Sequence, residues 1–296
     1  MSRSWWVCRG QSVLALMGIC ISLSTARLEA HEDAREQGIS LFGQTAASVL
    51  DSHFKRDELS WLLLDSKGNV LAEHWPNAQV PISPGSLVKP FLAAAYGEQH
   101  AFAFPHVECT GANGRCWLRR GHGRLGMEQA IAQSCNVYFL SLAQGIDRVQ
   151  AAATFKRYGL AGPPSVADDA SLIGLGEAWR ETPLALAQGY LALLEPSHSS
   201  EASVSPRLLK GMSTAAQSGT AREVDAVLGE RAALAKTGTA SCSHHPRASA
   251  DGFAIVLYPA AQPRLLLLVR QHGATGARTA ATAGAMLQAL GAGARP

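Results

Sequence analysis

The sequence predicts a mixed α/β fold of the α+β type, in which both ends of the chain build one antiparallel sheet and a mostly helical region is inserted between them. Three observations predict it. Two apolar runs around a turn lie near the amino end, and three strand-like runs lie near the carboxyl end. Between them, helical patterns alternate with loops rich in Gly and Pro. A site between the two lobes is the expected consequence.

The first half of the chain contributes a helix, a hairpin and a second helix. Residues 37–55 carry apolar positions at helical spacing. Residues 60–75 (SWLLLDSKGNVLAEHW) place two apolar runs around Ser-Lys-Gly-Asn, which is typical of a β-hairpin. Residues 81–99 (PISPGSLVKPFLAAAYGEQ) predict a turn that opens into a buried helix.

The second half contributes further helices and the remaining strands. Residues 127–146 and 182–194 have helical patterns, and the polar segment 195–206 predicts an exposed connection. Strands are predicted in ALAKTGTA, GFAIVLYP and RLLLLVRQ, and a final helix runs from about 277 to 290. We therefore expect one domain over residues 31–296. Its sheet lobe would cover about 37–82 and 230–296, and its helical lobe about 98–229.

The amino terminus predicts a secretory signal peptide over residues 1–26. Arg3 and Arg9 precede an apolar run from Val13 to Leu23, and small residues allow cleavage after Ala26 or after residue 30. The run is shorter than the roughly 20 residues that a membrane span needs, which favours a cleaved signal peptide. An uncleaved membrane anchor is the alternative. Either way, we expect the protein to be extracytoplasmic, in the periplasm or secreted.

Composition excludes several classes of protein. The 296 residues are 47% hydrophobic and 17% charged, which is typical of a globular protein. The formal net charge of +3 is too small for a nucleic-acid-binding surface, so no nucleic-acid partner is expected. Cys109 and Cys116 bracket a short Gly/Asn loop, and the sequence leaves open either a disulfide or two free thiols.

Ser86 and Lys89 are the first candidates for chemistry. They lie three residues apart at a helix start, so both side chains can face the same way. A serine hydroxyl is a weak nucleophile until a base takes its proton. An amine can be that base only when neutral, and burial or a second cation lowers its pKa towards that state.

Two further motifs support this pair. Ser134-Cys135-Asn136 is a polar triplet between two apolar helical patterns, which is unusual unless the polar groups face a site. Lys236-Thr237-Gly238-Thr239 lies on a predicted strand and offers a cation and two hydroxyls. Its glycine would let a substrate backbone lie close to that strand.

In order, these three motifs resemble those of the penicillin-binding proteins and serine β-lactamases. The flanks PGSLVKP, GHGRLGMEQAIAQSCNVYF, GLGEAWRETPLALAQGYLAL and AKTGTA resemble the transpeptidase domain of high-molecular-weight penicillin-binding proteins of class B. The likeness runs from about 59 to 290, without the pedestal domain of those proteins. It implies a β-lactamase/transpeptidase-like fold.

The resemblance also implies roles for the site residues. Ser86 would attack the carbonyl of a D-Ala-D-Ala stem peptide or a β-lactam and form an acyl-enzyme, with Lys89 as its base. Ser134 and Lys236 would pass a proton to the leaving amine, and Asn136 would bind the substrate amide. The substrate carboxylate would be bound by Lys236, Thr237 and Thr239, with Gly238 beneath the substrate. The backbone N–H groups of Ser86 and Thr239 would form the oxyanion hole.

The implied partners are peptidoglycan stem peptides, β-lactams and other proteins of cell-wall synthesis, and no metal or organic cofactor is implied. The expected activity is a D,D-transpeptidase or carboxypeptidase. A class D-like β-lactamase and a β-lactam- or muropeptide-binding sensor are the alternatives. The Glu-x-x-Leu-Asn loop of class A lactamases is absent, and Tyr158-Gly159-Leu160 departs from the Tyr-Gly-Asn of class D.

Two other motifs are set aside. Gly121–Gly126 matches the dinucleotide fingerprint G-x-G-x-x-G, but no buried strand precedes it and no βαβ unit surrounds it. We expect a loop that positions the Ser134 region instead. Cys242-Ser243-His244-His245 offers metal-ligand types, but no partner pair is evident, so a solvated loop between strands is favoured.

Overall fold

The computed structural model describes residues 37–54, 57–195, 205–242 and 248–291. The chain divides into two compact units, residues 1–45 and 46–296. Residues 37–45 are the described part of the first unit and are helical, and helical structure continues to residue 54 in the second, as predicted. The predicted signal peptide and most of the predicted connection at 195–206 lie outside the described residues. No helix in the described ranges combines the length and hydrophobicity of a membrane span.

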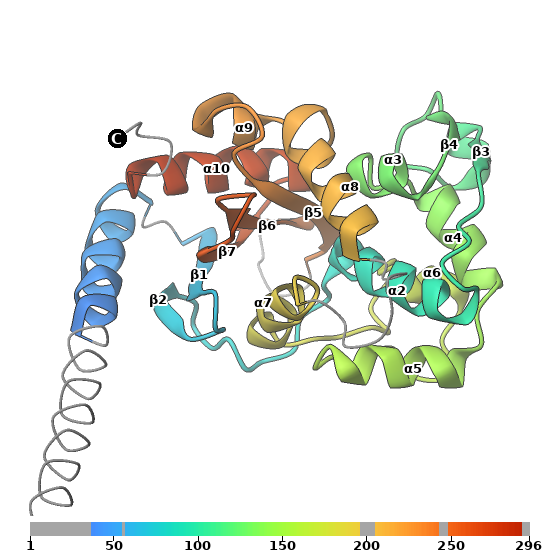
Figure 1. The fold of residues 1–296 in the computed structure, drawn as a ribbon, viewed down its shortest axis with the longest axis horizontal. Helices are drawn as coiled ribbons and strands as arrows, with labels where there is room; N and C mark the ends of the chain where they lie inside the picture. Colours follow the sequence, from blue (N-terminus) through green and yellow to red (C-terminus); the bar gives the residue numbers. More distant parts are fainter. Residues whose placement is uncertain (1–36, 55–56, 196–204, 243–247, 292–296) are drawn as a thin grey trace, which may run out of the picture. The chain divides into compact units, whose positions relative to one another are not determined.

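The second unit is built on a five-stranded antiparallel sheet with the order β2-β1-β7-β6-β5 (Figure 1). The strands are β1 (Leu59–Asp65), β2 (Val70–His74), β5 (Leu234–Ser241), β6 (Ala250–Tyr258) and β7 (Leu265–His272). The early hairpin joins the late strands where β1 pairs with β7, with Leu62 opposite Leu268. The predicted fold class is therefore confirmed, with one sheet drawn from both ends of the chain.

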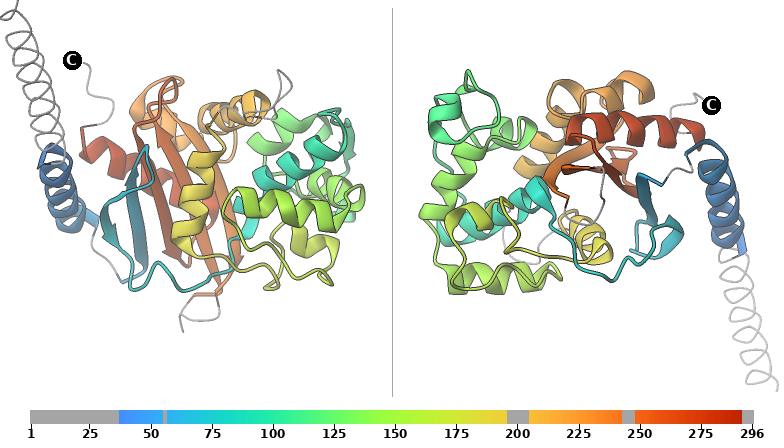
Figure 2. Two further views of the ribbon diagram at one scale, coloured as in Figure 1. Left: turned by 60° about the horizontal axis from the view of Figure 1, so that its bottom comes forward. Right: turned by 180° about the vertical axis from the view of Figure 1, so that it is seen from behind.

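Both faces of the sheet are covered, which explains why most side chains of its inner strands are apolar and buried. Alternate side chains of a strand point to opposite faces. Leu62 and Leu268 accordingly belong to one core, and Trp61 and Val269 to another. Buried residues of α8 (Ser205–Ser218), α9 (Glu223–Leu228) and α10 (Gly276–Ala289) complete the second core. The arrangement of helices about the sheet can be followed in Figure 2.

The first core extends into the helical region, and α2 lies at its centre. Every residue from Phe91 to Ala95 in α2 is fully buried. The helices of this region are α2 (Lys89–Gln99), α3 (Met127–Ala132), α4 (Asn136–Gln144), α5 (Arg148–Arg157), α6 (Asp169–Leu172) and α7 (Pro183–Ala192). Because α2 begins directly after the Ser86 turn, burying it on all sides fixes the position of that turn.

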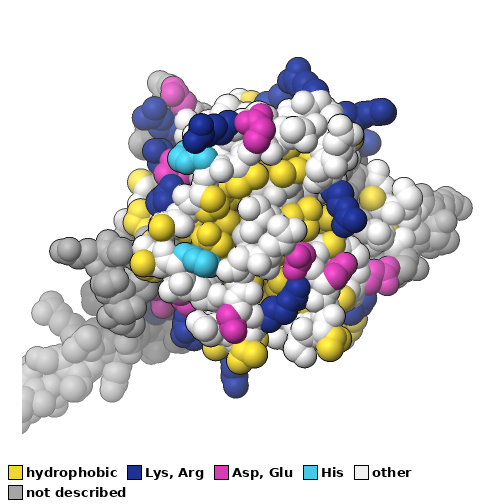
Figure 3. Space-filling view, turned by 90° about the vertical axis from the view of Figure 1, so that its right-hand side faces the viewer, with side chains coloured by type: hydrophobic (Ala, Val, Ile, Leu, Met, Phe, Trp, Pro, Cys, Tyr) yellow, Lys and Arg dark blue, Asp and Glu magenta, His cyan; other side chains and the backbone are white. Residues whose placement is uncertain are grey.

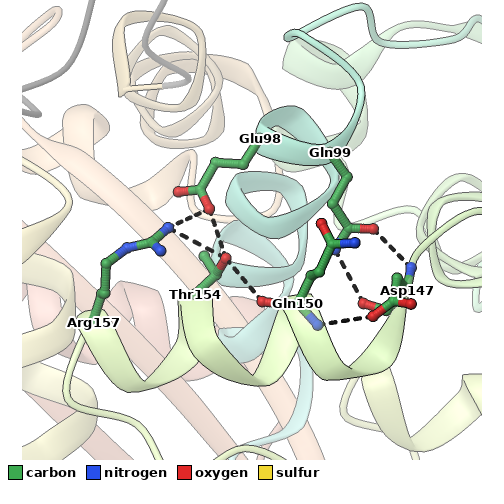
Figure 4. Close-up of polar contacts among 6 residues, drawn as sticks. All are labelled: Glu98, Gln99, Asp147, Gln150, Thr154 and Arg157. Carbon is green, nitrogen blue, oxygen red and sulfur yellow. Dashed lines mark hydrogen bonds and ion pairs between the residues drawn. The ribbon is translucent and has the colours of Figure 1, made fainter.

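Polar contacts at the far end of α2 hold it to α5 (Figure 4). The Glu98 carboxylate accepts a hydrogen bond from the Thr154 hydroxyl at 2.6 Å and pairs with Arg157. The Gln99 side chain exchanges two hydrogen bonds with the backbone of Asp147, the residue that caps α5. These contacts add directional bonds to a helix that is otherwise held by apolar packing.

A two-stranded sheet in the helical region was not predicted. Antiparallel β3 (Val107–Cys109) and β4 (Gly123–Leu125) enclose a short 3-10 helix, η2 (Gly111–Gly114). Each strand has three residues, and a charged pair lies at their centre, where Glu108 is opposite Arg124. Such strands lack the alternation of apolar and polar residues by which a strand is predicted from sequence. The segment was expected to be a loop for this reason.

Figure 3 shows the molecule from the side on which Figure 1 places β3, β4 and α4. Hydrophobic side chains gather in the middle of this face, and Lys, Arg, Asp and Glu lie around them. Trp117, which is 53% exposed, is one of the large apolar residues of the helical region that reach the surface. Charges of both signs border the face, so it does not have the single-sign surface that binds a polyanion.

The strand β2 forms one margin of the main sheet. It has five residues against the seven of β1, and their register shifts between Leu63 and Leu64. Of its side chains only Ala72 is buried, and Glu73 is exposed. The margin is therefore short and irregular, and it carries an exposed charge at Glu73.

Candidate active site

The Ser86 turn is a 3-10 helix, η1 (Gly85–Val88), that runs directly into α2. Pro90 is tolerated because the first helical positions have no intrahelical partner for their N–H groups. The Lys89 N–H donates to the Ser86 carbonyl, and the buried Tyr190 hydroxyl donates to the Leu87 carbonyl at 2.6 Å. Ser86 itself is half-buried, and its hydroxyl makes no hydrogen bond to any described residue.

Lys89 is fully buried one turn beyond Ser86. Its ammonium nitrogen donates to the Ser134 carbonyl at 2.8 Å and to Asn136 Oδ1 at 2.6 Å. It also lies 5.4 Å from the centre of the Phe139 ring. The amine therefore donates to two neutral oxygens and lies beside an aromatic ring.

The Ser134 turn joins α3 to α4 in a constrained conformation. Ser134 has φ +50°, in the left-handed region that residues other than glycine rarely adopt. Its N–H donates to the Ile131 carbonyl at 3.2 Å, and the Cys135 N–H donates to the Ala130 carbonyl at 3.0 Å. These bonds end α3 and turn the Ser134 carbonyl and the Asn136 amide towards Lys89.

Lys236 approaches the same turn from the sheet. It is fully buried on β5, and its Nζ donates to Ser134 Oγ at 2.9 Å and to the Thr237 carbonyl at 2.6 Å. Ser134 thus accepts from Lys236 through its hydroxyl and from Lys89 through its carbonyl. The structure brings four of the predicted residues, Lys89, Ser134, Asn136 and Lys236, into one buried hydrogen-bonded group.

Both amines are pushed towards their neutral forms. Burial lowers the pKa of Lys89 to about 7, although nearby Cys135 and Cys116 oppose the shift. Burial also places the pKa of Lys236 well below its usual value, and repulsion from Lys89 lowers it further. Two buried cations in one hydrogen-bonded group repel each other, so the group favours the loss of a proton near neutral pH.

The remaining predicted residues line the same end of β5. Thr237 Oγ1 lies 2.6 Å from the Thr220 hydroxyl, and exposed Thr239 accepts from the Gly276 N–H at 3.0 Å. A Cβ added to Gly238 would lie 3.0 Å from the Pro84 carbonyl, and one added to Gly85 would lie 2.6 Å from the Thr239 carbonyl. β5 therefore passes the Ser86 turn too closely for side chains at these glycines.

Two residues of the site were missed by the sequence analysis. Tyr190, on α7, donates a hydrogen bond to the Leu87 carbonyl in the Ser86 turn. The Thr220 hydroxyl is hydrogen-bonded to that of Thr237, and the Thr220 N–H donates to the Ala132 carbonyl at the end of α3. Neither belongs to a motif, and an isolated Tyr or Thr gives no signal of its own. Cys109 and Cys116, for which a disulfide and free thiols were both open, are free thiols.

Comparison with known proteins identifies the family. The model of the penicillin binding protein transpeptidase domain matches residues 65–290 of this chain. No curated protein is significantly similar to the sequence.

Solved structures share the fold at low sequence identity. Penicillin-binding protein 2 of Pseudomonas aeruginosa, in complex with WCK 5153, aligns at a TM-score of 0.65 and 20% identity, over 84% of this chain and 75% of that one. The transpeptidase domain of Burkholderia pseudomallei penicillin-binding protein 3 aligns at 0.62 and 16%, over 88% and 97%. Helicobacter pylori penicillin-binding protein 2, solved in complex with MreC, aligns at 0.66 and 17%, over 82% and 62%.

The family match covers most of the chain, and the folds agree over more than four fifths of it. The chain belongs to the penicillin-binding protein transpeptidase domain family.

Proposed function

We propose that this protein is an extracytoplasmic serine acyltransferase that binds D-Ala-D-Ala stem peptides and β-lactams and forms an acyl-enzyme on Ser86. The observation that carries the proposal is the buried group in which Ser134 accepts hydrogen bonds from both Lys89 and Lys236. Such a group is costly to bury, because each amine loses its hydration. A role in proton transfer beside the Ser86 hydroxyl explains why the protein buries this group.

Lys89 is proposed as the base that activates Ser86. Its pKa of about 7 gives it a substantial neutral fraction at neutral pH, and it lies one helical turn from the hydroxyl. The Ser86 hydroxyl is half-buried and makes no hydrogen bond to a described residue, so it is available to donate when substrate arrives. Its attack on the carbonyl forms the acyl bond, and its proton moves to the Lys89 amine.

Ser134 and Lys236 are proposed to return a proton to the leaving nitrogen. The 2.9 Å bond from Lys236 to Ser134 Oγ supplies the path from an amine to a hydroxyl. Asn136 would bind the substrate amide, and Thr237, Gly238 and Thr239 would form the edge on which the substrate carboxylate is held. The backbone N–H groups of Ser86 and Thr239 would donate to the developing oxyanion, and the close approach of Gly85 to Thr239 supports this pairing.

Cell-wall synthesis is the proposed setting, outside the cytoplasm. The Helicobacter pylori relative is described in complex with MreC, and we propose that this chain likewise works with a protein of the cell-wall machinery. The family match supports the substrate class, which is the stem peptide of peptidoglycan.

Labelling with a fluorescent penicillin tests the proposal. The full chain should carry one covalent label, and Ser86→Ala should carry none because the acyl bond has no oxygen to form on. Ser141→Ala, on α4 outside the hydrogen-bonded group, is the matched control and should label at the parental rate. An unlabelled parent, or a labelled Ser86→Ala, would refute the proposal.

The persistence of the label separates the candidate activities. Deacylation within seconds indicates a β-lactamase, whereas a label that lasts many minutes is the expected result for a transpeptidase, carboxypeptidase or sensor. Release of D-alanine from a stem pentapeptide then distinguishes an enzyme from a sensor, and we expect release that depends on Ser86.

A further inference from the structure

Four metal-ligating side chains meet beside the Ser134 turn, outside the hydrogen-bonded group described above. They are Cys109 at the end of β3, Cys116 after η2, His122 before β4, and Cys135 at the start of α4. Their ligand atoms all lie within 4.8 Å of one another. The three thiols are buried, and His122 is half-buried.

The separations match those of a tetrahedral zinc site. Zinc binds thiolate at about 2.3 Å and imidazole nitrogen at about 2.0–2.1 Å, so a tetrahedron sets sulfur atoms about 3.8 Å apart and sulfur and nitrogen about 3.5 Å apart. Here, His122 Nδ1 lies 3.5 Å from the sulfur of Cys109 and 3.5 Å from that of Cys116. The sulfur atoms of Cys116 and Cys135 are 3.9 Å apart. A disulfide would need about 2.05 Å, so the arrangement suits a shared ion and not a covalent bond.

A second group of ligand types provides an internal comparison. Cys242, Asp251 and His272 also converge, but Asp251 Oδ1 lies 2.5 Å from His272 Nδ1. Oxygen and nitrogen that share a zinc ion are about 3.4 Å apart, so these two atoms are bonded directly to each other. The Cys242 group therefore contains a direct hydrogen bond between two of its ligand atoms. The contacts given above for the group around Cys135 are longer, at 3.5–3.9 Å, and match the separations of atoms that share a zinc ion.

We propose that Cys109, Cys116, His122 and Cys135 bind one Zn²⁺ ion in a closed structural site of the Cys₃His type. Binding would release the thiol protons, since the ligands are thiolates. Three of the ligands come from the β3–η2–β4 segment and the fourth lies between Ser134 and Asn136. The ion would therefore tie that segment to the turn that contacts Lys89 and Lys236. The resemblance to the family implied no metal, and the proposal departs from it on the geometry of this chain.

The metal content of the purified chain tests the proposal. The full chain, prepared without chelators or metal-affinity steps, should contain about one zinc per molecule by elemental mass spectrometry. Cys109→Ser and His122→Ala should lower the content about tenfold or more. Cys242→Ser, which alters the comparison group, should keep the full content. Zinc that is absent from the parent, or lost only in Cys242→Ser, would overturn the assignment.

Cobalt and thiol measurements on the parent chain do not depend on whether a variant folds. Cobalt-loaded protein should show the absorption of tetrahedral cobalt with thiolate charge transfer. Native thiols should be protected from a thiol reagent until a chelator is added, and three more should then react. Mass spectrometry that finds a Cys109–Cys116 disulfide in the purified chain would contradict the proposal.

Discussion

At the scale of single residues, the two buried lysines dominate the chemistry of the site. Among the residues that the structure describes, neither Lys89 nor Lys236 donates a hydrogen bond to a carboxylate. Both donate to neutral oxygens, which belong to Ser134, Asn136 and Thr237. Neutral oxygens stabilise an ammonium group less than a carboxylate does. Burial therefore decides the protonation state, which is why both pKa values fall.

The acylation rate should rise with pH through neutrality. An amine with a pKa of about 7 is mostly neutral above that pH, and the neutral fraction of Lys89 rises about tenfold between pH 6 and pH 8. The initial rate of penicillin labelling should rise by a similar factor and then level off. Lys89→Arg should remove labelling, because a guanidinium stays charged. A rate that does not change between these pH values would show that Lys89 is not the base.

The predicted site residues came from motifs, and the structure adds what motifs cannot show. Ser86, Lys89, Ser134, Asn136 and Lys236 were chosen because their residue types recur at known spacings. The hydrogen bonds that join Ser134 to both lysines depend on residues about 45 and 102 positions apart in the chain, so spacing could not give them. Tyr190 and Thr220 act through position alone, and no local pattern marks them.

At the scale of elements, the Ser86 turn is positioned by backbone segments that pack closely against it. A Cβ added to Gly174 would lie 2.0 Å from the Gly85 carbonyl, and Gly174 has φ +79°. The Gly174 backbone therefore packs directly under the residue that precedes Ser86. The position of the nucleophile depends on a glycine in a loop that has no chemistry of its own.

Gly174→Ala should destabilise the fold and slow acylation together. The left-handed backbone alone costs about 1–2 kcal/mol with a side chain, and the clash adds to it, for a total of about 3 kcal/mol or more. Gly176→Ala is the matched control, because Gly176 has the same φ of +79° and nothing within 4 Å. It should lower the free energy of unfolding by only the backbone cost and leave labelling unchanged. Equal effects of the two substitutions in denaturant unfolding would contradict this account.

Removal of the proposed zinc should loosen the Ser134 turn. We expect a chelator to slow penicillin labelling by about tenfold to a hundredfold, because small displacements of reacting groups cost rate steeply. Added zinc should restore the rate, and Cys242→Ser should respond as the parent does. Loss of zinc without any change in labelling would show that Ser134 holds its conformation through its own hydrogen bonds.

Strongly apolar elements were predictable, and weakly patterned ones were not. β6 and β7 are runs of buried residues bounded by turns, and α2 follows a clear proline and glycine start, so each was found. β3 and β4 have three residues each, and their pairing is fixed by the surrounding segment instead of by their own pattern. Cys109, Cys116 and His122 lie in this segment, and they meet Cys135 only once it is folded. No local sequence pattern therefore joins the four residues.

At the scale of the whole molecule, the cores explain which parts of the chain the fold needs. The described residues of the two cores lie between Ala46 and Leu287 and cover both faces of the sheet. A chain that begins at Gln37 should therefore fold and label with penicillin as the full chain does. Thermal unfolding and labelling of the two chains provide the comparison. A lower unfolding temperature for the shorter chain would show that residues 1–36 add to the stability of the fold.

The margin of the sheet at β2 has a consequence for the behaviour of the protein in concentrated solution. A long, flat and apolar outer strand invites a second molecule to pair with it through backbone hydrogen bonds. Here the outer strand is brief, its register shifts against β1, and Glu73 places an exposed charge on it. Self-association through this edge is thereby discouraged, and the molecule can remain dispersed at high density.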